Sequence, residues 1–235
     1  MPPAPKSAGT FAVPARWEER TANRVLETGR DQILERSRKI VQAAYELLEE
    51  HGLEGLTIRA VLKRTGLSRR AFYERFEGKD DLVLALFEHT IRAAASHLTG
   101  LVRTTADPME RLRMIVTSLV LGNLTLGAPD GAQSNLRAAA LSREHLRLAE
   151  SRPADLQAAL RPLHAVITQQ LSDGMQAGCV RGDDPQRMAA LVYNLVSTTV
   201  HTELLAQESA RPDLAQRTRL EADIWEFCRR AITAG

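Results

Sequence analysis

The spacing of apolar residues constrains this chain most, because steps of three and four residues recur in segment after segment. They run from Asp31 to Glu50, where Gly52 supplies a stop, and again from Gly78 to about residue 98. Such steps place apolar side chains on one face of a helix. Four helices by residue 100 leave no room for a sheet, and no later segment forms a convincing strand. We therefore expect an all-α fold.

Length and composition are those of a folded globular protein. The 235 residues are 44% hydrophobic and 26% charged, with a formal net charge of +2. A chain of this size forms one large or two modest domains. Prolines crowd the first fourteen residues, and a charged, helix-permissive stretch follows from Arg16 to Glu27. We expect a flexible N-terminal extension over residues 1–29.

Several classes of protein are disfavoured by what the sequence lacks. Cys179 and Cys228 are far apart, without a metal-ligand spacing, so we expect neither a disulfide nor a metal site. No apolar run reaches membrane-spanning length, and the N-terminus lacks the apolar core of a signal peptide, which points to the cytoplasm. Motifs of hydrolases, metalloproteases and nucleotide-binding enzymes are missing. We expect no enzyme activity and no cofactor.

Positive charge is concentrated in one segment. Residues 55–80 carry seven Lys and Arg against three Asp and Glu, a local charge of +4, whereas the whole chain carries +2. The rest of the chain therefore sums to −2. A solvated helix face is one reading of such a cluster, and a polyanionic partner is the other.

The same segment predicts two short helices. Thr57 is a candidate N-cap for a helix that Gly66 ends, and Ser68 is a candidate N-cap for a second helix through Phe76. Two short helices that meet at a tight turn form a helix-turn-helix, whose second helix enters the major groove of DNA. This layout favours double-stranded DNA as the partner.

From Ile33 to Phe87 the sequence resembles the DNA-binding domain of the tetracycline-repressor (TetR) family. The matching motifs are Gly66-Leu67-Ser68, Phe72-Tyr73-Glu74-Arg75-Phe76 and Lys79-Asp80-Asp81-Leu82. Family members commonly have His where Arg75 stands. The resemblance implies an N-terminal three-helix DNA-binding domain, here residues 30–78, and a C-terminal helical effector-binding and dimerisation domain, here residues 79–235.

The resemblance also assigns DNA contacts. Thr57, Tyr73 and Lys79 would bind phosphates, and all three carry hydrogen-bond donors. Ser68, at the start of the second helix, is also assigned to the DNA contacts. Arg69 and Arg70, which follow it, would read bases, because a guanidinium can donate two hydrogen bonds to guanine. Phe72 and Phe76 are expected in the core.

In TetR proteins the last two helices pair with their two-fold mates, and this chain carries apolar stripes there. Burial in the chain's own core is the other reading of these stripes. A homodimer would present two helix-turn-helix units to a palindromic operator, with half-sites about 34 Å apart. The residues we assign to the dimer interface are Leu191, Leu195, Leu220, Ile224 and Phe227.

A TetR-like C-terminal half implies a pocket for a small-molecule effector. Because aromatic residues are scarce there, the pocket would be lined mainly by aliphatic side chains, and we expect an apolar effector. Candidate polar contacts are His89, Asn123, Tyr193, Asn194, Thr198 and His201. We predict a sequence-specific dimeric repressor that its effector releases from the operator. A ligand-independent regulator, an activator and an architectural DNA-binding protein remain open alternatives.

Overall fold

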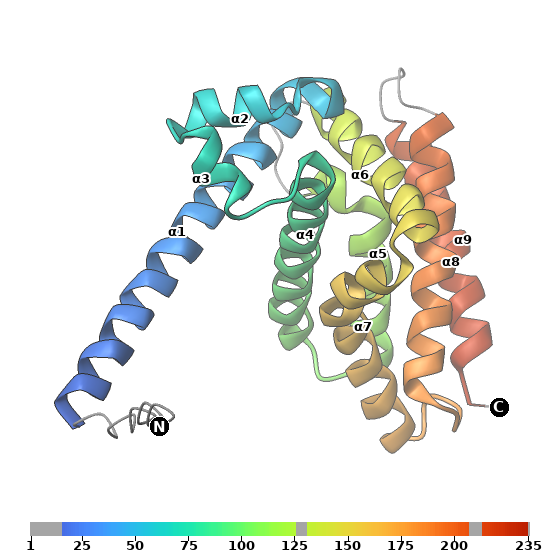
Figure 1. The fold of residues 1–235 in the computed structure, drawn as a ribbon. Coiled ribbons are helices and arrows are strands. Elements are labelled where there is room, and N and C mark those ends of the chain that lie inside the picture. The colour runs from blue at the N-terminus through green and yellow to red at the C-terminus, as the bar shows by residue number, and fades with distance from the viewer. Residues whose placement is uncertain (1–15, 126–130, 207–212, 235) are drawn as a thin grey trace, which may run out of the picture. The chain divides into compact units, whose positions relative to one another are not determined.

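The computed structural model describes the backbone of residues 16–125, 131–206 and 213–234, and side chains within 29–121, 140–205, 213 and 215–234. Over these ranges the fold is all-α, which confirms the expected fold class. The described elements are nine α-helices and one 3-10 helix (Figure 1): α1 (Arg16–Gly55), α2 (Ile58–Thr65), α3 (Arg69–Tyr73), α4 (Lys79–Leu101), η1 (Val102–Thr104), α5 (Pro108–Thr125), α6 (Gly131–Ser151), α7 (Pro153–Gln176), α8 (Pro185–Ala206) and α9 (Leu214–Ile232).

The first helix begins earlier than the sequence predicts. It takes in residues 16–29, which we expected to belong to a flexible extension. Neither proline nor glycine occurs between Arg16 and Thr28, so nothing local interrupts the helix. Gly52 breaks the helical geometry with a φ of 65°. The chain divides into two compact units, residues 1–39 and 40–235, and α1 contributes residues to both.

The second helix has the boundaries that its capping residues predict. The Thr57 hydroxyl accepts a hydrogen bond from the backbone N–H of Ala60 at 3.1 Å, which satisfies a donor that the first turn leaves unpaired. Gly66 ends the helix with a φ of 69°, in the left-handed region that glycine adopts at little cost. Its N–H donates to the Leu62 carbonyl and so closes the last turn.

The third helix is shorter than predicted. Ser68 caps it by accepting a hydrogen bond from the N–H of Ala71 at 3.1 Å. It ends at Tyr73 rather than Phe76, and the backbone N–H of Phe76 donates to the Phe72 carbonyl at 3.0 Å in the turn that follows. This turn leaves Phe76 buried, with 7% of its surface exposed.

A hydrophobic cluster fixes these short helices against their neighbours. Phe72 and Val61 are completely buried within it, and the Phe72 and Phe76 rings lie 5.5 Å apart between centroids. The cluster draws its members from α1, α2, α3 and α4, and from Ala140 at the middle of α6. The segment that carries the basic residues is therefore attached to the C-terminal half by packing as well as by the chain.

A second and larger hydrophobic cluster contains residues from every helix from α4 through α9. α7 packs against α4, α5, α6 and α8, so it is central to this half of the molecule. Pro162 lies inside α7 but does not split it, because one helix runs from Pro153 to Gln176. A kink at Pro162 stays a prediction. The start of α7 is unaffected by proline because Pro153 occupies a first-turn position, where the missing N–H has no helical acceptor.

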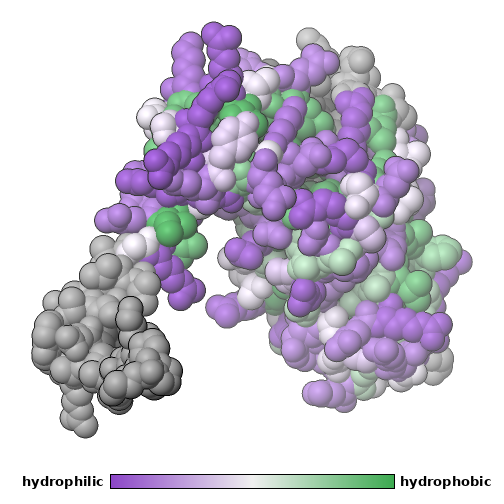
Figure 2. Space-filling model, viewed as in Figure 1, coloured by the Kyte–Doolittle hydropathy of each residue, from purple (hydrophilic) through white to green (hydrophobic). Residues whose placement is uncertain are grey.

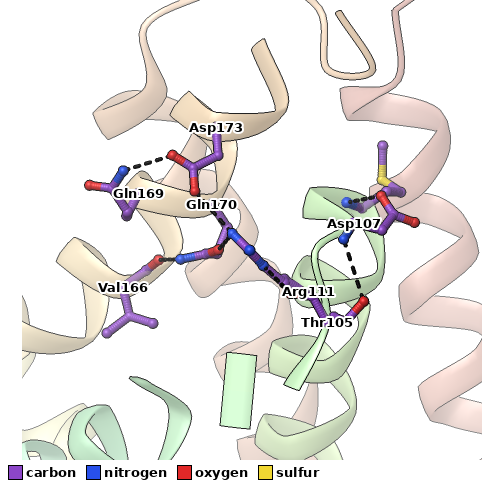
Figure 3. Close-up of polar contacts among 8 residues, drawn as sticks. Thr105, Asp107, Arg111, Val166, Gln169, Gln170 and Asp173 are labelled. Atoms are coloured by element: carbon purple, nitrogen blue, oxygen red, sulfur yellow. Dashed lines mark hydrogen bonds and ion pairs between the residues drawn. The ribbon is translucent and has the colours of Figure 1, made fainter. Parts of the chain in front are cut away.

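A polar network adds to the contact between α5 and α7 (Figure 3). The Arg111 guanidinium donates to the Thr105 carbonyl at 2.8 Å and reaches the Asp173 carboxylate at 3.2 Å. Gln169 donates to the other carboxylate oxygen at 2.8 Å. Arg111 is about a quarter exposed, so this charged contact lies at the edge of the core.

In the described part of the chain, no helix combines the length and apolar character needed to cross a bilayer.

The left-handed glycine at the end of α2 gives a direct test of this fold. We expect Gly66→Ala to lower the free energy of unfolding by about 1 kcal/mol, because a Cβ disfavours that conformation even though the space around it is open. Gly100→Ala is the matched control, since Gly100 is helical and equally unobstructed, and it should be neutral or stabilising. Urea denaturation measures both variants, and equal effects would contradict the assigned turn.

Candidate functional site

Basic side chains are exposed on the described surface of α2 and α3. Arg59 and Lys63 on α2 and Arg69 on α3 are all exposed. Hydrophilic side chains project over this region of the molecule (Figure 2). This surface, residues 57–79, is called the basic face below.

Two hydroxyl groups on the basic face keep a free donor. Thr57 and Ser68 each use an oxygen lone pair to cap a helix, at 3.1 Å from the capped N–H in both cases. A hydroxyl also carries one hydrogen that it can donate. Both residues are exposed, so each can offer this hydrogen to a phosphate oxygen without losing its cap.

Tyr73 projects from a buried support. Its side chain is 55% exposed, and its ring meets the buried Phe72 ring edge to face, with 5.4 Å between the centroids. An edge-to-face contact holds an aromatic ring in one orientation. The phenol hydroxyl is thereby presented outside the core next to the basic side chains.

The two candidate base readers differ in their surroundings. Arg69 is exposed with no ion pair among the described residues. The Arg70 Nε donates to Glu74 at 2.9 Å, and this hydrogen bond holds the pKa of the Glu74 carboxyl below its usual range. Because Arg70 is 89% exposed, the pair is weak, and the guanidinium can exchange it for an acceptor on DNA.

Two other cations of the segment have internal roles. Only 5% of the Arg75 side chain is exposed, and it donates to the Ala71 carbonyl and contacts Glu74. Arg64 donates two hydrogen bonds to Glu50 on α1, at 2.9 and 2.6 Å. Neither guanidinium is directed at an external partner, so the local excess of charge overstates the cations that can meet DNA.

Lys79 begins α4 and is exposed. Its ammonium donates to the Leu53 carbonyl at 3.3 Å, which leaves two of its three hydrogens without that bond. The residues predicted to contact DNA are therefore all exposed, and they occupy the basic face together: Thr57, Ser68, Arg69, Arg70, Tyr73 and Lys79.

A cavity of about 170 Å³ lies within the C-terminal half, lined by residues of α4, α5, α6, α7 and α8. Most of its wall is apolar and includes Phe87, Ile91 and Val200. Polar groups gather on α6 and α8, where they are Ser142, His145, Tyr193, Ser197 and His201.

Sequence analysis found only part of this cavity. Tyr193 and His201 line it as predicted for effector contacts, whereas His89, Asn194 and Thr198 are exposed and do not line it. The side chain of Asn123 lies outside the described residues. The sequence did not predict His145. It lies 56 positions from His201 in the chain, on a different helix, so their contact cannot be predicted from the local sequence.

The imidazoles of His145 and His201 line the cavity, and a third, that of His164, lies against the lining residue Tyr193. The rings of His145 and His201 lie 4.7 Å apart between centroids, and His164 on α7 lies 4.9 Å from the Tyr193 ring. Burial lowers the pKa of His145 and His164, and burial together with the neighbouring His145 lowers the pKa of His201 to about 4. The cluster is therefore uncharged at neutral pH.

Two buried nitrogens of this cluster have no hydrogen-bond partner among the described residues. They are Nδ1 of His145 and Nε2 of His164. Buried polar atoms are almost always paired, so these two are exceptions, and of the two residues His145 lines the cavity whereas His164 does not. Across the described residues, no three His, Cys, Asp or Glu side chains are grouped so as to hold a metal ion.

Apolar side chains are exposed where α8 and α9 lie side by side (Figure 1). Leu191 is 59% and Phe227 is 64% exposed, and both line an apolar hollow of about 300 Å³ together with Leu195. Leu220 is half-buried, while Ile224 is 5% exposed and belongs to the chain's own core. Residues Leu191, Leu195 and Phe227 are called the α8–α9 face below.

Comparison with known proteins points to one family. The family model "Bacterial regulatory proteins, tetR family" matches residues 40–86. The HTH-type transcriptional repressor Rv1474c of Mycobacterium tuberculosis (strain ATCC 25618 / H37Rv) is 29% identical over 186 residues, which cover 72% of this chain and 95% of that protein.

Solved structures share the fold at lower identity. A TetR-family regulator from Pectobacterium atrosepticum has a TM-score of 0.69 at 17% identity, over 88% of this chain and 98% of that one. RolR bound to resorcinol gives 0.62 at 14% identity, covering 85% and 94%. FadR of Bacillus subtilis bound to stearoyl-CoA gives 0.59 at 18%, covering 81% and 96%.

The imidazole cluster predicts a loss of stability in acid. Because the pKa of His201 is lower in the folded chain than in the unfolded chain, unfolding takes up a proton as the pH falls from 7 to 4. The shift from 6.5 to about 4 corresponds to a loss of about 3 kcal/mol over that range. His201→Gln should remove this part of the pH dependence.

The control is His97→Gln, because His97 is exposed on α4 and does not line the cavity. Urea denaturation at pH 7 and at pH 5 gives the comparison. If His201→Gln and the unaltered protein lose the same stability between the two pH values, the buried, uncharged state of His201 is wrong.

Proposed function

Because the chain belongs to the TetR family of bacterial transcriptional regulators, we propose that it is a dimeric repressor that a small effector releases from a palindromic operator. Family membership makes it a DNA-binding regulator rather than an enzyme. The observation that carries the proposal is the basic face, where six exposed donor residues are supported by one buried cluster. Such a regulator acts in the cytoplasm, where the DNA is.

The basic face provides two kinds of contact. Thr57, Tyr73 and Lys79 donate to phosphates, which position the protein on DNA without reading its sequence. Ser68 adds a further donor at the start of α3, next to Arg69 and Arg70. Arg69 can enter the major groove and read guanine directly, and Arg70 can do so by exchanging its hydrogen bond with Glu74 for one to DNA. We place the domain boundary between residues 78 and 79, with the helix-turn-helix before it and effector binding and dimerisation after it. Lys79, the first residue of α4, is the one proposed DNA contact beyond this boundary.

The α8–α9 face supports a homodimer. Leu191 and Phe227 are large apolar side chains more than half exposed, and they flank the hollow with Leu195. Contiguous exposed apolar surface is typical of a protein–protein contact. Pairing of two such faces across a two-fold axis would cover them and place two basic faces on one DNA duplex. Leu220 extends this contact, and Ile224 supports it from within the core.

Helix α6 can carry a signal from the cavity to the basic face. It supplies His145 to the cavity wall, and its Leu141 packs against both hydrophobic clusters. Arg147, two positions beyond His145, reaches Asp80 in the first turn of α4 at 3.4 Å. An effector that displaces α6 would therefore act on the residue next to Lys79. A coupling of about 1 to 3 kcal/mol is enough to change operator occupancy.

An architectural DNA-binding protein is the alternative, and DNA binding separates the two. We expect tighter binding to the DNA upstream of the protein's own gene than to a scrambled duplex. Tyr73→Phe removes one phosphate contact and should weaken binding to both duplexes by roughly fivefold. Arg70→Ala should reduce the preference between them by roughly 10-fold or more. Fluorescence anisotropy at two salt concentrations measures these affinities.

Arg92→Ala serves as the charge-matched control, since Arg92 is exposed on α4 away from the basic face, and it should leave the preference unchanged. Equal and steeply salt-dependent binding to both duplexes, unaffected in preference by Arg70→Ala, would favour the architectural alternative.

The dimer has its own test. The double variant Leu191→Glu, Phe227→Glu should sediment as a monomer, because it places charges at two apolar contacts of the proposed interface. Operator affinity should fall by roughly 100-fold as the two half-sites are no longer bound together. Leu146→Glu is the matched control, since Leu146 is 49% exposed on α6 outside the α8–α9 face. A double variant that stays dimeric would refute the assigned interface.

A further inference from the structure

We propose that the cavity between α4, α6 and α8 takes an uncharged, hydroxyl-bearing molecule about the size of one six-membered ring. This inference rests on the proposed function, in which this cavity is the effector site, and it adds the chemical class of the effector. Four features of the cavity carry it: its volume, its apolar wall, its lack of charge and the uncharged polar side chains at one end.

The volume limits the size of the molecule. The cavity measures about 170 Å³. An apolar cavity of about 150 Å³ in a protein core is large enough for benzene, whereas sites for drug-sized ligands begin at about 300 Å³. A single ring with a small substituent therefore fits inside the cavity, whereas a long acyl chain would have to extend beyond it.

The apolar wall favours a molecule that is itself mostly apolar. Phe87, Ile91, Leu119, Leu163, Val196 and Val200 form much of it. Five of these six carry aliphatic side chains, so a ring would be held by shape and by burial of apolar surface rather than by stacking on several aromatic residues.

The charge of the lining excludes ionised ligands. No Asp, Glu, Lys or Arg occurs among the described lining residues, and the two lining histidines have pKa values lowered by burial. A carboxylate or an ammonium group in this cavity would lose its hydration without gaining a counter-charge, which costs several kcal/mol.

The polar end of the cavity selects a hydroxyl group. His145 and His201 both line this end of the cavity, with their rings edge to face and 4.7 Å apart between centroids, and Nδ1 of His145 has no hydrogen-bond partner among the described residues. In a neutral imidazole one nitrogen donates and the other accepts. A hydroxyl can do both, so one group on the ligand can pair with His145 in either tautomer and reach a second neighbour, such as Ser142 or Ser197.

Three probes of nearly equal size test this class. Phenol has the ring and the hydroxyl, toluene has the ring without a polar group, and benzoate has the ring with a negative charge. Isothermal titration at pH 7.5 with the full-length protein should show saturable binding of phenol, at least tenfold weaker binding of toluene, and no binding of benzoate. The inference is overturned if benzoate binds most tightly, if toluene equals phenol, or if none of the three binds.

Variants separate recognition from mere cavity filling. His145→Leu should bring phenol binding down to the level of toluene, because it removes the polar partner while keeping an apolar wall. His145→Gln keeps a donor and an acceptor and should retain part of the difference. His97→Gln, outside the cavity, should change nothing. Each variant is first checked for unaltered helicity and unaltered affinity for the upstream duplex, so that a folding defect is recognised.

Operator release is measured in the same samples, which keeps the inference distinct from the proposed function. Phenol that binds and weakens the protein–DNA complex supports both. Phenol that binds through His145 without changing DNA affinity supports the ligand class and contradicts effector-driven release. Intact operator binding with no saturable binding of phenol contradicts the ligand class alone.

Discussion

Burial of Phe72 is the contact on which the basic face depends. The third helix has five residues, and a helix of that length is not stable by itself in water. Phe72 is completely buried in the cluster that joins α1, α2, α3 and α4, while Tyr73 beside it is more than half exposed. One position thus fixes the helix to the core, and the next presents a phenol hydroxyl outside it. Caps at Thr57 and Ser68 set where each short helix begins, so the donors occupy fixed places.

Packing also determines how the two halves of the larger unit can communicate. Ala140 and Leu141 on α6 enter the cluster that holds Phe72, and Leu141 contacts the C-terminal cluster as well. The same helix contributes Ser142 and His145 to the cavity, and Arg147 to an ion pair with Asp80. Since packed cores deform little, a ligand that moves one turn of α6 must also move its neighbours. The cavity and the basic face are therefore mechanically linked through one element.

Local signals in the sequence were enough to predict where α2 begins and ends and where α3 begins. Thr57, Gly66 and Ser68 act within one turn of their own helices, so their roles could be predicted from the residue types alone. The sequence could not show that Arg64 and Arg75 have partners inside the protein. Arg64 pairs with Glu50 on α1, and Arg75 donates to the Ala71 carbonyl from the turn after α3. The pairing of His145 with His201 depends on the folded chain, because the two residues lie on different helices. Exposure of His89, Asn194 and Thr198 depends on helix rotation, which apolar spacing sets only approximately.

Selection of bound duplexes from a pool of random sequences tests the central claim, sequence-specific binding by two copies of the basic face, most directly. The account predicts enrichment of an inverted repeat whose half-sites lie about one turn of DNA, roughly 34 Å, or a multiple of it apart. Recovery of duplexes with no common motif, or of a single unrepeated half-site, would contradict it.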